Sequence, residues 1–221
     1  MQTKTLALGA GALLSLAAAG SAQAQFINGS FESGDFGGWV TQDLGSPFWP
    51  LGVAPAGAVN TFGWPWSNTP TDGLFDASHG FDGDGGTGPV NLIRIAQDVF
   101  IDGPTLTFDY RGAWDLTFGG VLDRTFTVNV EVLGGGANLQ SDLILTATQG
   151  TTVLDTGPLA GVVDMSAFTG LSVRVSFDWL VPEDFSGPAQ FTLDNVNLVP
   201  APGALALLGL AGLQRRRRRR N

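Results

Sequence analysis

The chain has 221 residues, which is enough for one domain with a sizeable core and short for two. Hydrophobic residues make up 43% and charged residues only 14%, with 32 glycines and 12 prolines, a balance that disfavours long exposed helices and favours short strands joined by tight turns. There is no cysteine, so disulfides, thiol nucleophiles and cysteine metal sites are excluded.

The first segment, residues 1–24, has the pattern of a secretory signal peptide. A single early lysine, Lys4, precedes an apolar stretch, and Ala22 and Ala24 supply the small residues of a cleavage site. The alternative is a buried core helix. We predict export, cleavage after Ala24, and a mature domain of residues 25–199.

The predicted mature domain is strongly acidic. All 20 acidic residues lie within residues 25–199, against four arginines and no lysine. A domain of this charge repels phosphate backbones, which argues against nucleic acid as a partner. It also suits calcium at extracellular concentration, unless the acidity only keeps an exported protein soluble.

Alternating apolar and polar residues indicate β-strands throughout the mature domain. In the last strand the alternation changes register after Asp194 and Asn195, so that Val196 and Leu198 follow on the apolar face. Turns rich in glycine separate the strands, and no amphipathic helix is visible. We therefore predict an all-β fold, an antiparallel β-sandwich of the jelly-roll type, because each apolar strand face needs a second sheet to cover it. The predicted strands lie in residues 91–101, 104–112, 124–136, 141–149, 151–157, 171–180 and 190–199.

Residues 44–89 break this rhythm and are rich in proline, glycine and tryptophan. Loops of this length in a compact domain tend to be functional or disordered. Flat aromatic faces stack on sugar rings, so we predict a sugar-binding role for Trp49, Trp64 and Trp66. The alternative is that they cover the open edge of the sandwich as a hydrophobic lid. The remaining tryptophans are predicted core residues, because they lie in or beside strand patterns: Trp39, Trp114 and Trp179.

Catalytic patterns are weak. His79 is the only histidine, and the Gly-x-Ser-x-Gly motif of serine hydrolases is absent. With 20 acidic residues, some carboxylate pair would match glycosidase spacing by chance. Asp76, Asp82 and Asp84 resemble a fragment of a calcium loop, but a turn held by aspartate side chains explains them as well. We predict that the protein is not an enzyme.

Two segments of the mature domain resemble galactose-binding-like jelly rolls, which occur in many carbohydrate-binding modules. They are "FINGSFESGDFGGWV" at residues 26–40 and "FTLDNVNLV" at residues 191–199, and "IAQDVFIDGPTLTFDYRG" at residues 95–112, between them, adds to the resemblance. The resemblance extends over roughly residues 26–199 and implies two packed antiparallel sheets whose first and last strands are neighbours. It also implies a structural calcium ion held by Glu32 and Asp194, with Asn28 nearby. The alternative is that these side chains face solvent or cap turns.

The final segment, residues 200–221, combines a Pro-x-Pro motif, a short apolar run and six arginines. An uninterrupted helix over residues 203–213 would measure on the order of 17 Å, well short of a hydrocarbon core of about 30 Å, so only marginal, transient membrane insertion is expected. The arrangement resembles the PEP-CTERM sorting signal, although Ala201 stands where that motif usually has glutamate. The residues that carry the resemblance are Pro200, Pro202, Arg215, Arg216, Arg217 and the arginines that follow.

The sorting-signal resemblance implies an exosortase-type enzyme that cleaves near the motif and passes the protein to the cell surface. A polyarginine patch for anionic lipid or nucleic acid is the alternative. With the signal peptide, this predicts an exported protein of the cell surface or extracellular matrix that binds polysaccharide without catalysis. The main rival is a structural or adhesive matrix protein without a sugar site, and a glycoside hydrolase is a third.

Overall fold

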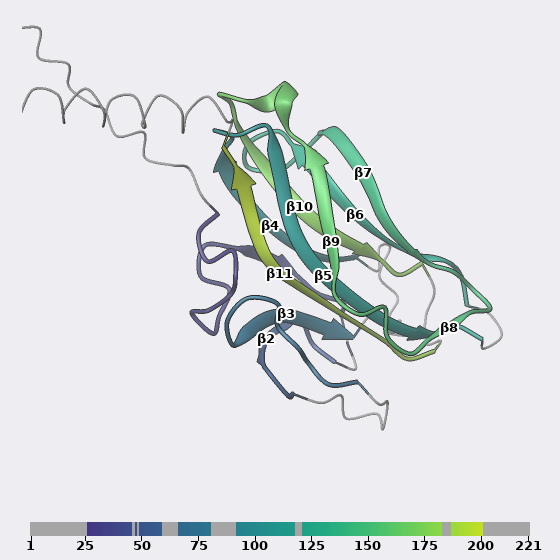
Figure 1. The fold of residues 1–221 in the computed structure, drawn as a ribbon. Coiled ribbons are helices and arrows are strands. Elements are labelled where there is room, and N and C mark those ends of the chain that lie inside the picture. Colours follow the sequence, from purple (N-terminus) through teal and green to yellow (C-terminus); the bar gives the residue numbers. More distant parts are fainter. Residues whose placement is uncertain are drawn as a thin grey trace, which may run out of the picture.

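The computed structural model describes residues 26–45, 47, 49–58, 66–80, 92–117, 121–182 and 187–200. These residues form eleven strands and one short helix, in the order labelled in Figure 1. Among them, no helix has the length and apolar character needed to cross a bilayer. Several predicted features lie outside the described residues: the signal peptide, Trp64, Asp82, Asp84, Pro202 and the terminal arginines.

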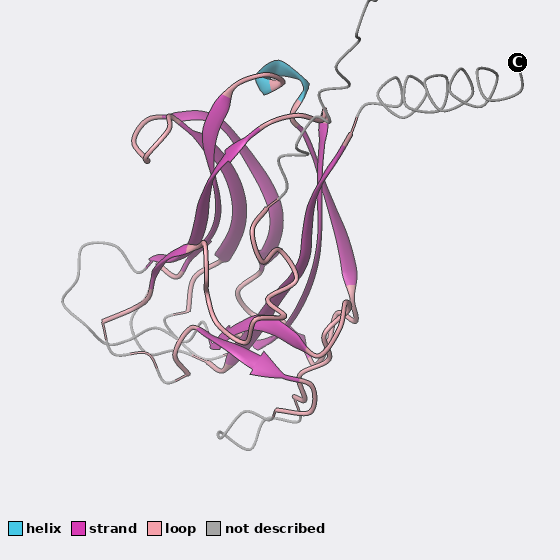
Figure 2. Cartoon of the chain, turned by 90° about the vertical axis from the view of Figure 1, so that its left-hand side faces the viewer, coloured by secondary structure: helices cyan, strands magenta, loops and turns pink. Residues whose placement is uncertain are grey.

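The strands form two antiparallel sheets, which Figure 2 shows as separate layers. The five-stranded sheet has the order β1-β4-β10-β6-β7, with strands Val40–Gln42 (β1), Leu92–Phe100 (β4), Ser172–Leu180 (β10), Arg124–Glu131 (β6) and Asn138–Ala147 (β7). The second sheet has the order β2-β3-β11-β5-β8, and β9 also pairs with β5. Its strands are Gly52–Pro55 (β2), Phe75–Gly80 (β3), Ala189–Val199 (β11), Thr105–Asp115 (β5), Thr152–Val153 (β8) and Leu159–Asp164 (β9), and a 3-10 helix, Ser166–Phe168 (η1), follows β9.

The core lies between the two sheets, where the apolar residues of the alternating strands meet. Phe126 of β6, Trp179 of β10 and Phe191 of β11 are each at most 2% exposed. Their rings pack with centroid distances of 4.6 Å between Phe126 and Phe191 and 4.5 Å between Trp179 and Phe191. The predicted all-β sandwich is therefore confirmed, as is the burial of Trp39, Trp114 and Trp179.

A β-bulge interrupts β11 where the sequence pattern changes register. Pairing with β5 shifts between Asp194 and Asn197, and Asn195 takes a left-handed conformation with φ of 52°. Because of this extra residue, Val196 and Leu198 remain buried in the core after the bulge. The predicted register change is confirmed.

The N-terminal segment differs from the expectation of a first strand beside the last. Residues 27–38 form turns, with positive φ at Asn28 and Phe31, and the first strand, β1, pairs with β4. The turns reach β11 through a hydrogen bond from the Val196 amide to the Gly29 carbonyl at 3.0 Å. Gly29 approaches β11 so closely that a side chain there would collide with the Val196 carbonyl. A docked turn thus replaces the predicted pairing of terminal strands.

The long segment 44–89 is also more regular than its composition indicates. It contains β2 and β3, which pair with each other, and β3 also pairs with β11. The pattern "FDASHG" of β3 shows no clear alternation, because five of its six residues are buried. The strand β9 also lies outside the predicted strand segments.

Candidate functional site

Trp66 is buried against the outer face of the second sheet. Only 3% of the residue is exposed. The Arg111 guanidinium lies over its ring, 4.3 Å from the centroid, and is held there by hydrogen bonds to the Ser67 carbonyl and to both oxygens of Asp155. In this arrangement Trp66 is a lid over the outer face of the second sheet, not over an open edge of the sandwich, and it has little ring surface to offer to a sugar.

Trp49 is the one predicted sugar-binding tryptophan with a partly exposed side chain among the described residues. Its carbonyl accepts a hydrogen bond from the Gly80 amide at 3.0 Å, which fixes it at the end of β3. The loop that carries it leaves β1 directly after Gln42, and Asp43 holds that loop by accepting a hydrogen bond from the Leu51 amide at 2.7 Å. Trp49 therefore lies on a loop that starts beside the five-stranded sheet.

The predicted calcium ligands surround one loop, residues 70–75. Asp194 is 2% exposed, and its Oδ2 accepts hydrogen bonds from the Thr71 and Asp72 amides at 2.7 and 2.8 Å. Glu32 Oε1 accepts from the Leu74 and Phe75 amides, both at 2.8 Å. The two carboxylates therefore clamp the same loop from the N-terminal turns and from the last strand.

Asn28 makes its side-chain hydrogen bonds within the N-terminal turns. Its Oδ1 accepts a hydrogen bond from the Ser33 amide and its Nδ2 donates to the Asp35 carbonyl. Because the amides of residues 71, 72, 74 and 75 point at the two carboxylates, they supply positive partial charge where calcium would need oxygen ligands. This geometry does not favour a calcium ion shared by the three residues, and the calcium site stays a prediction.

Chelation distinguishes this metal-free, hydrogen-bonded loop from the calcium site that the resemblance implies. We expect the melting temperature of the protein to be the same in calcium and in EGTA, because the amide hydrogen bonds hold the loop without a metal. Asp194→Ala should lower it equally in both solutions, since the variant loses three backbone hydrogen bonds. A calcium-dependent rise in melting temperature that disappears in Asp194→Ala would instead establish the calcium site.

Asp76 lies beside Asn68 with incomplete hydrogen bonding. It is fully buried, and its Oδ1 accepts a hydrogen bond from Asn68 Nδ2 at 2.5 Å. Asp76 Oδ2 and Asn68 Oδ1 are buried without a hydrogen-bond partner among the described residues. Burial, assisted by the charge of the nearby Asp194, raises the pKa of Asp76 to about 7 against the opposing effects of Asn68 and Arg111. A proton on Asp76 is therefore retained well into the range where carboxylates are normally ionised.

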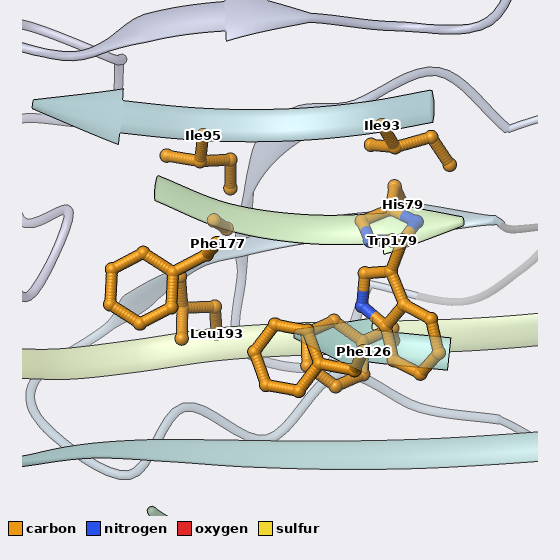
Figure 3. Close-up of a pocket in the computed structure, with 9 residues that line it drawn as sticks. His79, Ile93, Ile95, Phe126, Phe177, Trp179 and Leu193 are labelled. Atoms are coloured by element: carbon orange, nitrogen blue, oxygen red, sulfur yellow. The ribbon is translucent and has the colours of Figure 1, made fainter. Parts of the chain in front are cut away.

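The interior holds a cavity of about 10 Å³ between the sheets, at the lower limit for one water molecule. Figure 3 shows His79 and Trp179 among the aromatic and aliphatic side chains that line it. Burial lowers the pKa of His79 to about 3, so this histidine is neutral at physiological pH. Within the described part of the chain, no three histidine, aspartate or glutamate side chains group to hold a metal. The cavity is a packing feature of the core.

The most organised polar arrangement lies on the outer face of the five-stranded sheet. We call it the polar stripe and define it as Gln42 (β1), Arg94 (β4), Asp178 (β10), Thr127 and Asn129 (β6) and Ser141 (β7). Arg94 donates to both oxygens of Asp178, at 2.9 and 2.6 Å, and Asn129 Nδ2 donates to Asp178 Oδ2 at 2.8 Å. Ser141 Oγ donates to Asn129 Oδ1 at 2.6 Å. One chain of hydrogen bonds thus crosses four neighbouring strands.

Strand register explains why these side chains meet. Arg94 pairs with Asp178 and with Gln42, while Asn129 pairs with Ser141. Alternate residues of β4, such as Ile93 and Ile95, point into the core, so the residues between them point outward. The exposed ends of the stripe are Gln42 and Ser141, and its centre is partly or fully covered.

The centre of the stripe is a charge cluster. Arg94 also forms an ion pair with Glu131, which is 1% exposed, at 2.9 Å. Burial raises the pKa of Asp178, and the hydrogen bond and charge of Arg94 oppose that rise. Burial alone would lower the pKa of Arg94, but the contacts with Asp178 and Glu131 outweigh it and raise it. The guanidinium therefore stays charged and fixed between two carboxylates.

Sequence patterns did not point to this stripe. Its members come from five strands far apart in the chain, and each one has the appearance of an ordinary solvent-facing residue in an alternating strand. The available signal was Arg94, a charge in the middle of the otherwise apolar run "LIRIA". An isolated charge in a buried strand indicates a partner, but only the fold identifies Asp178 and Glu131.

No family model and no curated protein matches the chain. Solved structures give distant likenesses. TmCBM61 in complex with β-1,4-galactotriose is 11% identical, with 80% of this chain and 99% of that chain covered and a TM-score of 0.48. The K3 cleaved adhesin domain of Lys-gingipain from Porphyromonas gingivalis is 14% identical, with 80% and 99% covered and a TM-score of 0.48. CBM27-1 of Caldicellulosiruptor saccharolyticus in complex with mannohexaose is 13% identical, with 78% and 96% covered and a TM-score of 0.45.

Proposed function

We propose that the protein is an exported, non-catalytic carbohydrate-binding protein that holds a polysaccharide across the outer face of its five-stranded sheet. The observation that carries this proposal is the polar stripe, a continuous chain of hydrogen bonds from Arg94 to Ser141 on a face that the fold leaves uncovered by the other sheet. These contacts support the proposal without help from the distant likenesses above.

The chemistry of the stripe suits a sugar. A polysaccharide offers hydroxyl groups that both donate and accept, and the exposed Gln42 and Ser141 side chains supply both kinds of group. Between the longer side chains lie the short Ala96 and Ser176, which are paired with each other across β4 and β10. Because Arg94 and Asn129 are already fixed by hydrogen bonds, little side-chain entropy is lost when a ligand binds.

Aromatic stacking would come from the tryptophan loop. The loop that carries Trp49 leaves β1 directly after Gln42, one end of the stripe, and then reaches the end of β3 in the second sheet, where the Trp49 carbonyl accepts from the Gly80 amide. A partly exposed indole at the rim offers a flat face for one sugar ring, worth about 1 kcal/mol beyond its buried area. We include Trp49 as the aromatic part of the proposed site, and Trp64 stays a prediction from the sequence alone.

Substitution of the exposed ends of the stripe tests the proposal. Gln42→Ala combined with Ser141→Ala is expected to weaken binding to the recognised polysaccharide by about tenfold, since two side-chain hydrogen-bonding groups are lost. Thr41→Ala is the matched control, because Thr41 neighbours Gln42 on β1 and points to the opposite face. Isothermal titration with the polysaccharide found by array screening measures both. Equal affinities of the double variant and the control for the polysaccharide would contradict a binding role of the polar stripe.

A second candidate function, adhesion or matrix assembly, is favoured by one observation. The strand β7 is ten residues long and forms an open edge of its sheet, with Leu139 and Leu143 at 52% and 63% exposure. Open apolar edges of this length pair readily with other strands. Self-association in sedimentation experiments that Leu143→Lys abolishes, without any polysaccharide binding, would favour this function over the first.

Export and sorting complete the proposal. The pattern of residues 1–24 supports secretion, and the pattern of residues 200–221 supports processing by an exosortase-type enzyme with transient membrane insertion and delivery to the cell surface or matrix. Intact-mass measurement of the protein recovered from cells tests both parts. A mature chain that starts at Gln25 and ends near Pro202 is expected, and a chain that keeps either end would contradict the corresponding part.

A further inference from the structure

The arginine and histidine side chains of the mature domain are few, and each of them is described in the structure. Residues 25–199 contain four arginines, no lysine and one histidine. On the five-stranded sheet, Arg94 is fixed by Asp178 and Glu131, as above. On the same face, Arg174 donates to both oxygens of Asp98, at 2.7 and 3.1 Å. Both guanidinium groups of this face are therefore occupied by carboxylates.

The remaining positive groups are also occupied or buried. Arg111 donates to both oxygens of Asp155, at 2.8 and 2.6 Å, and covers the ring of Trp66. Arg124 is 0% exposed and donates to the Gly187 carbonyl. His79 is 2% exposed and neutral. The β-sandwich thus presents no arginine or histidine that is both exposed and unpaired.

This arrangement decides which ligand charges the surface tolerates. Recognition of a carboxylate, sulfate or phosphate depends on charge-assisted hydrogen bonds, usually from an arginine fork. An anionic ligand would here have to compete with a carboxylate that is already bound in bidentate geometry. It would also approach a domain whose 20 acidic residues far outnumber its four arginines. Uncharged hydroxyl groups meet neither obstacle.

We infer that the ligand is an uncharged polysaccharide, and that polymers of uronic acids or sulfated and phosphorylated sugars are excluded. This inference rests on the proposed function and adds the chemical class of the ligand. The exposed ends of the stripe, Gln42 and Ser141, agree with it, because both are uncharged donors and acceptors.

The test compares one polymer in two charge states. The neutral polysaccharide bound in an array screen is offered to the full chain before and after partial carboxymethylation, by isothermal titration. The full chain with arginines 215–220 replaced by glutamine is measured in parallel, so that anion binding by the tail is recognised. We expect carboxymethylation to weaken binding by about tenfold or more at low salt, and by less at high salt because the repulsion is screened.

Two substitutions with the same change of net charge sharpen this test. Asp98→Asn releases Arg174 on the face of the stripe, and Asp155→Asn releases Arg111 on the opposite sheet. The first should recover part of the lost affinity for the carboxymethylated polymer and the second should not. If the glutamine-tailed chain binds the carboxymethylated polymer as tightly as the neutral one, or more tightly, the inference is overturned and the proposed function stands. If the chain binds no polymer at all, the proposed function is overturned as well. Strong binding to an amine-bearing polymer that vanishes with salt would also overturn the inference.

Discussion

Replacement of Asp76 by asparagine is expected to stabilise the protein at pH 8 and to leave its stability nearly unchanged at pH 4. Below its ordinary pKa of 3.8, Asp76 is protonated in both the folded and the unfolded chain. Between 3.8 and about 7 only the folded chain keeps the proton, so the free energy of unfolding falls as the pH rises, and above about 7 it falls no further. The full penalty is on the order of 4 kcal/mol, which the uncharged asparagine side chain would avoid.

Asparagine suits position 76 because of the pairing with Asn68. An asparagine places an N–H donor where a protonated carboxyl would carry its hydrogen, so it offers a second hydrogen bond toward the otherwise unpartnered Asn68 Oδ1. Thermal melts from pH 4 to 8 measure the effect. Asp123→Asn removes an exposed carboxylate and is the control, with little change expected at either pH. A gain for Asp76→Asn that is as large at pH 4 as at pH 8 would show that its carboxyl is ionised throughout.

Replacement of Arg94 by methionine is expected to destabilise the protein by about 3–5 kcal/mol, because it leaves Asp178 and Glu131 buried without their shared positive partner. Arg94→Lys keeps the charge but loses the bidentate geometry with Asp178, so an intermediate loss is expected. Urea unfolding at pH 7 measures the free energy of each variant.

Arg174→Met is the matched control for Arg94. Arg174 lies on the same face, and its partner Asp98 is 41% exposed, so the loss of this pair should cost less than about 1 kcal/mol. At low pH the cost of Arg94→Met should shrink, because burial raises the pKa of Asp178 and the protonated carboxyl no longer needs a positive partner. If Arg94→Met and Arg174→Met lower the free energy of unfolding by similar amounts, the charges around Arg94 are as well screened by solvent as those of an exposed ion pair.

Much of the fold follows from local patterns in the sequence. The alternation in residues 171–180 identifies β10, and the register change after Asp194 identifies the bulge of β11, because a period of two places each side chain on one face or the other. The strand β3 escapes this reasoning because it is covered on both faces, by the core and by the lid of Trp66 and Asn68.

The candidate site follows far less from the sequence, for a physical reason. The contact of Arg94 with Asp178 joins residues 84 positions apart, and that of Asn129 with Asp178 joins residues 49 apart. Nothing local determines such pairs, because strand order and register decide them. Trp66 is misleading in the sequence for the same reason. Its place in a segment rich in proline, glycine and tryptophan favours an exposed binding residue, but in the fold Arg111 lies over its ring and Trp66 forms part of a lid.

The most direct test of the account is a map of the ligand contacts by amide chemical shifts in solution. On addition of the neutral polysaccharide, we predict the largest changes at Gln42, Arg94, Thr127 and Ser141, with Trp49 at the rim. The outer face of the second sheet, at Thr107 and Asn197, should be unaffected. Changes confined to that second face, or to β7 with no change at Gln42 and Arg94, would contradict the proposal that the polar stripe carries the binding site.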